Sequence, residues 1–336
     1  MNIHTMSSSP ALSTVRCSDP EAFSAMLPDV DRRILPLVTD LGFFQAELRL
    51  GQLRLAIIKR PPCTSMVHVA KTRIGIVLPM NDLPGLKLNG LPLDRPALVN
   101  HGSSVPLQMF QPGELTIAAI IFPAQDCDRG WPERNHAARV DEIRPAAFEQ
   151  LRLMIADVVS LAWRSPLQLS RQNLVSGLQQ SLLGVFDHAF LSTPGEISAA
   201  LAIRKYVRIC RLVDEFLSDA AAEIRSSAEI ADAAGVTIRT LHNAMIAVKG
   251  MSLQRFVMLN RLWAVRAALL RAGPEDLIKT IALDHGFWHL FSRKPTGRFS
   301  ANRLRTPCAC VRTSPCTHER PTSAFLVKGG YTFWLV

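Results

Sequence analysis

The sequence lacks several features that would place it in a chemical class at once. No run of about 18 uncharged apolar residues occurs, so no membrane span is expected. The first residues, MNIHTMSSSPALSTVRC, show no basic stretch followed by an apolar core, so we expect no secretory signal. The seven cysteines are odd in number and mostly scattered, which argues against a disulfide framework and favours a cytoplasmic protein in a reducing compartment.

The motifs of common catalytic sites are missing as well. The chain contains no glycine-rich phosphate loop, no H-E-x-x-H and no G-x-S-x-G. His68 and His101 fall in a strand-rich region, but no H-x-H with a following glutamate accompanies them, so core or surface histidines are favoured over metal ligands. We therefore expect a protein that is not an enzyme, with no catalytic residue, no cofactor and no metal site.

Positive charge is present, but at one end only. The formal net charge of the 336 residues is +10. Residues 201–336 hold 20 Lys plus Arg and 10 Asp plus Glu, an excess of +10, whereas residues 1–200 hold 18 of each kind. A basic part joined to a neutral part suggests that one end meets a polyanion, although a solvated basic surface explains the charge equally well.

The sequence pattern changes along the chain, which is long enough for two domains. Residues 1–30 are polar and serine-rich, and we expect them to be loose. Short β-rich runs separated by Gly and Pro turn signals then indicate a small barrel or sandwich, at 53–59, 73–79, 97–101, 105–110 and 116–122. Apolar residues at three- and four-residue spacing predict helices over 145–164 and 171–190, and helices dominate up to about residue 290.

One helical stretch, SSAEIADAAGVTIRTLHNAMIAVKG at residues 226–250, has the pattern of a helix-turn-helix. We expect Ser227 to cap a first helix that starts at Ala228. Gly235, four residues after the small Ala231, can adopt the left-handed conformation of a tight turn. Thr237 would then cap a second helix over 238–248, with Leu241 and Met245 facing inward. An ordinary helical hairpin is the alternative.

The outward face of that second helix carries side chains that read DNA. Arginine can bind guanine bidentately, asparagine can bind adenine, and threonine can contact a phosphate or a thymine methyl. The residues expected to point outward are Thr237, Arg239, Thr240 and Asn243.

The turn signal occurs twice. EIADAAGV at 229–236 returns as TIALDHGF at 280–287, an offset of 51 residues. Between the copies, SLQRFVMLNRLWAVRAALLRAG at 252–273 has a serine cap, an apolar stripe and a glycine end, which predicts a long connecting helix. Two reading units held by a rigid helix could enter successive major grooves on one DNA face.

These three blocks, in this order and at this spacing, resemble the DNA-binding half of the AraC/XylS transcription regulators over about residues 226–290. The segments LNRLWAVR and HGFWHL are most similar to the ethanolamine-operon-regulator branch. The resemblance implies a two-domain α+β protein. A cupin-like β-barrel with flanking helices, over 31–195, would sense an effector and dimerise. An all-α double helix-turn-helix domain, over 200–300, would bind DNA.

The resemblance also implies site residues and partners. Thr237, Arg239, Thr240 and Asn243 would contact bases or phosphates of double-stranded DNA. Further DNA-binding candidates lie in the two predicted helix-turn-helix units, which we call the first and the second reader. They are His242 in the first reader and Trp288 and His289 in the second, with plain exposure as the alternative. The expected partners are a second copy of the chain, a small-molecule effector of unknown identity and RNA polymerase, with no membrane.

Three alternatives stay open at this stage. The helices at 145–164 and 171–190 would either form the dimer contact or simply pack on the barrel. The chain could be a degenerate regulator that dimerises but no longer binds DNA specifically. A cupin-type metal enzyme fused to a helical domain is a third interpretation, against which the missing ligand triad and the duplicated helix-turn-helix both argue.

The family pattern breaks after Leu290. Pro295 and Gly297 interrupt the second recognition helix that should follow, and an interior proline costs a helix about 3 kcal/mol. If the reading frame is shifted by one base, the codons from Phe291 onward can encode Phe-Ala-Lys-Thr-Tyr-Arg-Ala-Leu-Phe-Gly-Glu-Ser-Pro. That sequence is the ending typical of the family. We therefore expect a small insertion or deletion near Leu290, real or a sequencing error, which leaves the second unit incomplete.

The same shift accounts for the cysteine-rich end of the chain. Residues 301–336 are then a disordered, out-of-frame tail. A zinc site is the alternative, but C-x-C followed by C-x-H is not a usual structural spacing; the residues concerned are Cys308, Cys310, Cys316 and His318.

Overall fold

The computed structural model describes residues 3–7, 12–27, 29–70, 72–101, 106–123, 129, 131, 139–191, 195–196, 201–218, 226–273, 275–287, 324–327 and 331–334. The chain divides into two compact units, residues 1–256 and 257–336. Its class is mixed α+β, with β-sheets in the N-terminal region and helices after them, as the sequence predicts.

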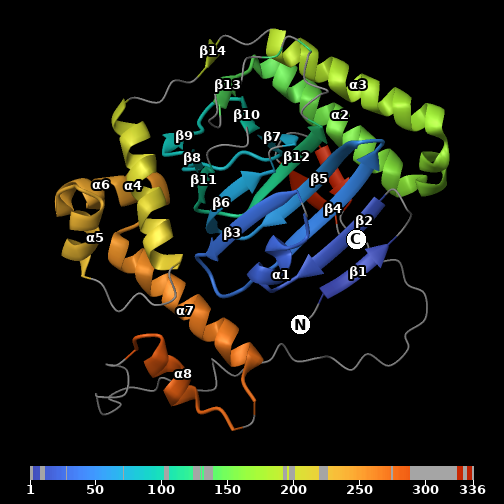
Figure 1. The fold of residues 1–336 in the computed structure, drawn as a ribbon. Helices are drawn as coiled ribbons and strands as arrows, with labels where there is room; N and C mark the ends of the chain where they lie inside the picture. Colours follow the sequence, from blue (N-terminus) through green and yellow to red (C-terminus); the bar gives the residue numbers. More distant parts are fainter. Residues whose placement is uncertain are drawn as a thin grey trace. The chain divides into compact units, whose positions relative to one another are not determined.

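Two antiparallel sheets make up the β-domain within the first unit (Figure 1). Among the described residues the larger sheet has the order β1-β2-β4-β5-β12-β7-β10-β13-β14, and the smaller has the order β3-β6-β11-β8-β9. The strands of the larger sheet are β1 (Ile3–Ser7), β2 (Leu12–Cys17), β4 (Phe43–Leu50), β5 (Leu53–Arg60), β7 (Arg73–Pro79), β10 (Ala97–His101), β12 (Leu115–Pro123), β13 (Arg139–Glu142) and β14 (Gly195–Glu196). Those of the smaller sheet are β3 (Val30–Pro36), β6 (Cys63–Val69), β8 (Lys87–Leu88), β9 (Leu91–Pro92) and β11 (Leu107–Gln111).

The helices come after these strands, apart from the short α1 (Pro20–Ser24). In the first unit they are α2 (Pro145–Arg164), a 3-10 turn over Pro166–Ser170, α3 (Gln172–Leu191), α4 (Leu201–Ser218), α5 (Ser227–Ala233) and α6 (Ile238–Lys249). Helix α7 (Leu253–Arg271) contains the division between the units, and α8 (Ile278–Asp284) belongs to the second. None of the helices in the described part of the chain is long and apolar enough to span a membrane.

The central strands of the larger sheet are buried on both faces. In β12 nearly every residue is buried, because one face points between the two sheets and the other lies under helices. Helices α2 and α3 pack against each other beside this sheet, and α3 contacts β4 (Figure 1). Apolar residues line the inner faces of the two helices and are buried there: Phe148, Leu151, Ile155, Val158, Leu182, Phe186 and Phe190. Packing on the sheet therefore explains their amphipathic pattern, whereas a role in dimerisation stays a prediction.

Some predicted elements match and others do not. The expected runs 53–59, 73–79, 97–101 and 116–122 coincide with β5, β7, β10 and β12, and 105–110 overlaps β11. The prediction that residues 1–30 are loose is wrong for much of that segment. It contributes β1, β2 and α1, and it buries Leu12 and Phe23 because both side chains are apolar and face the core.

The C-terminal tail also differs in part from expectation. Two short strands within it, β15 (Ala324–Val327) and β16 (Tyr331–Trp334), pair antiparallel, so the expectation of disorder is wrong for these two runs. Both runs are rich in apolar and aromatic residues, which favours a strand regardless of reading frame. The other residues of 301–336, including the cysteine-rich cluster, lie outside the described residues.

Candidate nucleic-acid interface

Helix α5 opens the segment that the sequence predicts to be the first helix-turn-helix. Its N-cap is Ser226, not Ser227 as predicted, and the helix starts one residue earlier than expected. The reason is a capping box: the Glu229 amide donates to Ser226 Oγ at 3.2 Å, and the Ser226 amide donates to the Glu229 carboxylate at 2.8 Å. The reciprocal pair needs a hydroxyl residue three positions before Glu229, which is Ser226 and not Ser227. The following Ile230 and Ala231 are buried, as the pattern predicts.

The turn after α5 has the predicted geometry. Gly235 adopts a left-handed conformation with φ of +63°. Its amide donates to Asp232 O at 2.9 Å, and the Val236 amide donates back to Ala231 O at 3.0 Å. These two bonds close the end of α5 and redirect the chain within three residues.

Helix α6 then presents one buried and one exposed face. Leu241 and Met245 face inward as predicted, together with Ala244 and Val248. Arg239, His242 and Asn243 are exposed on the outer side of the same helix. The residues of the first reader singled out from the sequence are therefore brought together within two turns.

The two threonines play a partly different role from the one predicted. Thr237 caps α6, since its hydroxyl accepts from the Thr240 amide at 3.2 Å, and the two hydroxyl oxygens lie 2.9 Å apart. Both therefore already make a local contact. Thr237 is exposed and Thr240 is partly exposed, so each retains a face toward solvent.

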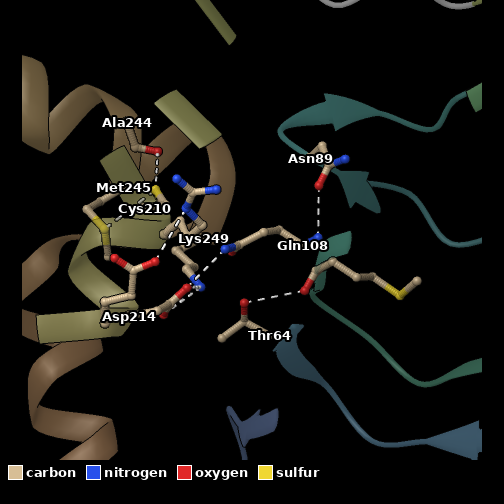
Figure 2. Close-up of polar contacts among 11 residues, drawn as sticks. Thr64, Asn89, Gln108, Cys210, Asp214, Ala244, Met245 and Lys249 are labelled. Carbon is tan, nitrogen blue, oxygen red and sulfur yellow. Dashed lines mark hydrogen bonds and ion pairs between the residues drawn. The ribbon is translucent and has the colours of Figure 1, made fainter. Parts of the chain in front are cut away.

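A buried polar cluster joins the C-terminal end of α6 to the β-domain (Figure 2). Lys249 Nζ donates to both carboxylate oxygens of Asp214 in α4, at 2.9 and 2.7 Å. Gln108 of β11 donates its Nε2 to the same carboxylate at 2.9 Å. The side chains of Lys249 and Asp214 are only 3% and 7% exposed, so solvent and salt screen this pair little. We call these three residues the anchor cluster.

Close backbone packing accompanies the anchor cluster. Gly250 ends α6 with φ of +69°, and any Cβ at this position would overlap the Phe110 ring of β11. A Cβ on Gly90, in the turn between β8 and β9, would lie 3.2 Å from a Val248 methyl. In addition, Lys87 Nζ donates to Ile246 O at 3.3 Å. The smaller sheet thus touches the last turn of α6 while leaving its first turns exposed.

Helices α4 and α6 are also joined by a buried cysteine (Figure 2). The Cys210 thiol donates to Ala244 O, with a sulfur–oxygen distance of 3.5 Å. Burial raises the pKa of Cys210 to about 12. The thiol therefore stays protonated near neutral pH and acts as a packing group.

The anchor cluster was missed by sequence reasoning. Asp214 and Gln108 are single polar residues in separate elements, and no spacing connects them. Lys249 did carry a signal, because it lies four residues after the buried Met245, on the inward stripe of α6 where an apolar residue is expected.

The second copy of the turn signal, at residues 280–287, repeats the geometry of the first. Ala282 of α8 is buried, and Gly286 adopts φ of +81°. The Gly286 amide donates to Leu283 O at 2.9 Å, and the Phe287 amide donates to Ala282 O at 3.0 Å. These are the bonds of the first turn, each moved by 51 residues. Trp288 and His289, the candidates of the second reader, lie outside the described residues.

Two further sequence expectations concern the connecting helix and metals. Helix α7 covers Leu253–Arg271 within the predicted 252–273, and Ser252 Oγ accepts from the Arg255 amide at 3.3 Å, as expected of a cap. In the described part of the chain, no three His, Cys, Asp or Glu side chains gather as metal ligands would.

Similarity to known proteins is confined to solved structures, since no family model and no curated protein sequence matches the chain. The AraC-like transcriptional activator CuxR matches at 13% identity and a TM-score of 0.38, over 80% of this chain and 98% of CuxR. ToxT from Vibrio cholerae matches at 12% identity and a TM-score of 0.24, over 70% of this chain and 90% of ToxT. At identities and TM-scores this low, the likeness carries no conclusion about family or function.

Proposed function

We propose that this protein is a sequence-specific regulator of transcription that binds double-stranded DNA through α6. The observation that carries the proposal is the turn repeated at an offset of 51 residues, with the same two hydrogen bonds in both copies. A helix-turn-helix needs such a turn to hold its second helix away from its first. In the first copy that second helix exposes Arg239, His242 and Asn243.

Each exposed side chain of α6 has a distinct role in the proposal. Arg239 binds a guanine edge through two N–H groups, and Asn243 one turn later binds an adenine. Thr237 and Thr240, at the N-terminus of α6, contact a phosphate, where the helix dipole also favours negative charge. His242 is also exposed on α6 and adds a further contact. If the second reader is complete in solution, Trp288 and His289 serve it in the same way.

The rest of the proposal concerns the other parts of the chain. Residues 31–195 would be a cupin-like domain that binds a small effector and pairs two copies of the chain, and residues 200–300 would bind DNA. The proposed location is the cytoplasm, where a regulator meets both DNA and RNA polymerase. The anchor cluster supports coupling between the parts, because it connects the β-domain to the last turn of α6.

A gel-shift titration tests the function. The full chain is titrated against the DNA that flanks its gene and against a scrambled duplex, at several salt concentrations. A specific complex whose affinity falls steeply with salt is expected, because each phosphate contact releases counterions. Equal binding to both duplexes would contradict sequence recognition.

A second candidate function is a regulator that dimerises but no longer reads DNA specifically. The sequence after Gly286 favours it, because Pro295 and Gly297 fall where a second recognition helix should continue. Sedimentation of the full chain as a dimer, together with no specific gel shift, would support this candidate over the first.

A further inference from the structure

Two arginines are buried between the sheets of the β-domain. Arg60, from β5 of the larger sheet, is 2% exposed and reaches Ser65 and Met109 of the smaller sheet. Arg32, from β3 of the smaller sheet, is 6% exposed and donates to Gln45 of the larger one. Both side chains therefore cross the interior of the domain, from opposite sides.

The hydrogen bonds of the two guanidinium groups go to neutral groups, although the charge of Glu47 also acts on Arg32. Arg60 contacts a hydroxyl oxygen at 3.3 Å and a thioether sulfur, and Arg32 contacts the Gln45 side chain and the backbone oxygen of Phe23. The Nε of each arginine is buried without a hydrogen-bond partner. A carboxylate does lie in the same region, that of Glu47, but it pairs with Arg49 at 3.3 Å.

Unpaired charge in such a place is costly. Burial lowers the pKa of Arg60, and burial followed by the Arg60 charge lowers that of Arg32 to about 10. Arginine keeps its proton in proteins, so both side chains are cations. A buried charge is normally paired or hydrogen-bonded throughout, because desolvation is otherwise uncompensated. Arg60 and Arg32 each keep a buried Nε–H without a hydrogen-bond partner, so both can donate to a further anion beside the Glu47 carboxylate.

A third buried group lies beside Arg60. Gln111 is fully buried and donates its Nε2 to Pro61 O at 2.7 Å and to Arg60 O at 3.3 Å, while its Oε1 has no partner. A free acceptor on a residue that contacts the Arg60 backbone, together with the free guanidinium donors, fits a ligand that carries both a negative group and a hydroxyl group.

We propose that the interior of the β-domain binds a small hydroxy carboxylate between Arg60, Arg32, Ser65 and Gln111. The carboxylate takes the fork of N–H groups that arginine offers to planar oxyanions. The ligand hydroxyl donates to Gln111 Oε1, and the Ser65 hydroxyl completes the oxygen contacts.

The site lies on the strand that also touches the anchor cluster. Met109 and Gln111 of β11 face the buried arginines, whereas Gln108, nearer the start of the strand, faces Asp214 of α4. Successive side chains of a strand point to opposite faces, so one strand contacts both places. As an effector site the inference rests on the proposed function, whereas binding itself can be measured without DNA.

Isothermal titration calorimetry and thermal melting of the full chain test the inference. The probes are lactate, malate and gluconate, with acetate, phosphate and chloride as comparisons at equal ionic strength. At least one hydroxy acid should bind and raise the melting temperature with increasing concentration, by several degrees at about 100 times its Kd. No binding by any of the three, or an equal effect of phosphate or chloride, overturns the proposal.

Substitution separates a ligand-binding arginine from a structural one. Arg60→Met keeps the volume but removes the charge, so it should abolish the response and leave the melting temperature in chloride unchanged or higher. Arg171→Met, at an exposed arginine outside the proposed site, is the control and should keep the response. A response retained in Arg60→Met overturns the proposal. If that variant does not fold, Arg32→Met is read in the same way.

The outcomes distinguish this inference from the proposed function. Calorimetric binding with no specific gel shift leaves the oxyanion site in place and contradicts DNA recognition. A specific gel shift with no calorimetric binding supports DNA recognition and contradicts the oxyanion site.

Discussion

The two copies of the helix-turn-helix signal share a turn and differ in the segment after it. Leu241, Ala244, Met245 and Val248 make the buried face of α6. The sequence 51 residues further on has Ser292, Pro295, Thr296 and Phe299. Only the last of these suits a buried helical face.

The difference shows that the turn and the reading helix have separate requirements. The turn needs a small residue, a glycine and an apolar residue over six positions, and both copies have them: Ala231, Gly235 and Val236, then Ala282, Gly286 and Phe287. The reading helix needs an apolar stripe over about three turns, and only the first copy has one. A one-base shift after Leu290 would produce this separation, because it preserves everything before it.

The largest effect is expected from restoring the shifted frame. A gene altered by one base near the Leu290 codon should yield a chain with a second reading helix. Since the second contact is then intramolecular, affinity for a two-site duplex should rise by about 10²–10⁴-fold. The measurement is a gel shift against one-site and two-site duplexes, with the unaltered chain alongside.

The control for this prediction replaces the regained Tyr-Arg pair by alanines, which should return the affinity toward that of the unaltered chain. An unchanged affinity in the restored chain would contradict the hypothesis. A nucleotide sequence in which no single shift yields the family ending would contradict it too.

The anchor cluster should give the next largest effect, and it belongs to the first copy alone, since Ser300 stands 51 residues after Lys249. Asp214→Asn leaves Lys249 charged and buried without its counter-ion. We expect a loss of about 3–5 kcal/mol in the free energy of unfolding, measured by urea denaturation of the full chain.

The matched control is the neighbouring carboxylate. Glu215 is 60% exposed and pairs with Arg211, so Glu215→Gln should cost less than about 1 kcal/mol. The double variant Asp214→Leu with Lys249→Met should recover most of the lost stability, because apolar residues of similar volume replace a buried ion pair at little cost. Equal losses in Asp214→Asn and Glu215→Gln would show that the pair is not buried in solution.

How well each strand was predicted depends on how locally it is encoded in the sequence. Strand β12 was predicted because its residues are apolar on both faces, and β5 because of its apolar run Leu55–Ile58. Strand β4 was not predicted, because Gln45 and Glu47 place polar groups between the sheets. Strand β6 was hidden in the same way by Thr64 and Ser65. Polar residues that serve the interior look like loop residues in sequence, and only the tertiary fold distinguishes the two.

In the candidate site, too, the features encoded by nearby residues were predicted and those that depend on distant residues were not. The Thr237 cap, the turn before it and the exposed side of α6 depend on residues within about 25 positions of one another, so spacing predicts them, although it misplaced the cap of α5 by one residue. The anchor cluster joins Gln108 to Asp214 and Lys249 across more than 100 residues, and nothing local marks such a contact.

Base recognition by the first copy should give a smaller effect. Arg239→Ala should cost about 1–3 kcal/mol of discrimination between the specific and the scrambled duplex. The reason is that two donors to one guanine are lost, while the helix keeps its cap at Thr237 and its buried face. Competitive gel shifts at fixed salt measure the ratio of the two affinities.

The comparison variant is Arg49→Ala, since Arg49 is an exposed arginine of the β-domain. It should change both affinities little and their ratio not at all. A loss of discrimination no larger for Arg239→Ala than for Arg49→Ala would remove Arg239 from the reading face.

The smallest effect compares the two turns directly. Gly235→Ala and Gly286→Ala each force an alanine into a left-handed conformation, which costs about 1–2 kcal/mol. Around Gly235 no atom lies near the added Cβ, so strain alone should set the loss there. Hydrogen exchange of the Val236 and Phe287 amides, which close the turns, should become faster in the matching variant.

Gly177→Ala in α3 is the control, because replacing a helical glycine that has open space around it should raise the free energy of unfolding by about 0.5–1 kcal/mol. An effect at Val236 without one at Phe287 would mean that only the first copy folds as a unit in solution, with the second turn too weakly formed to protect its own amide.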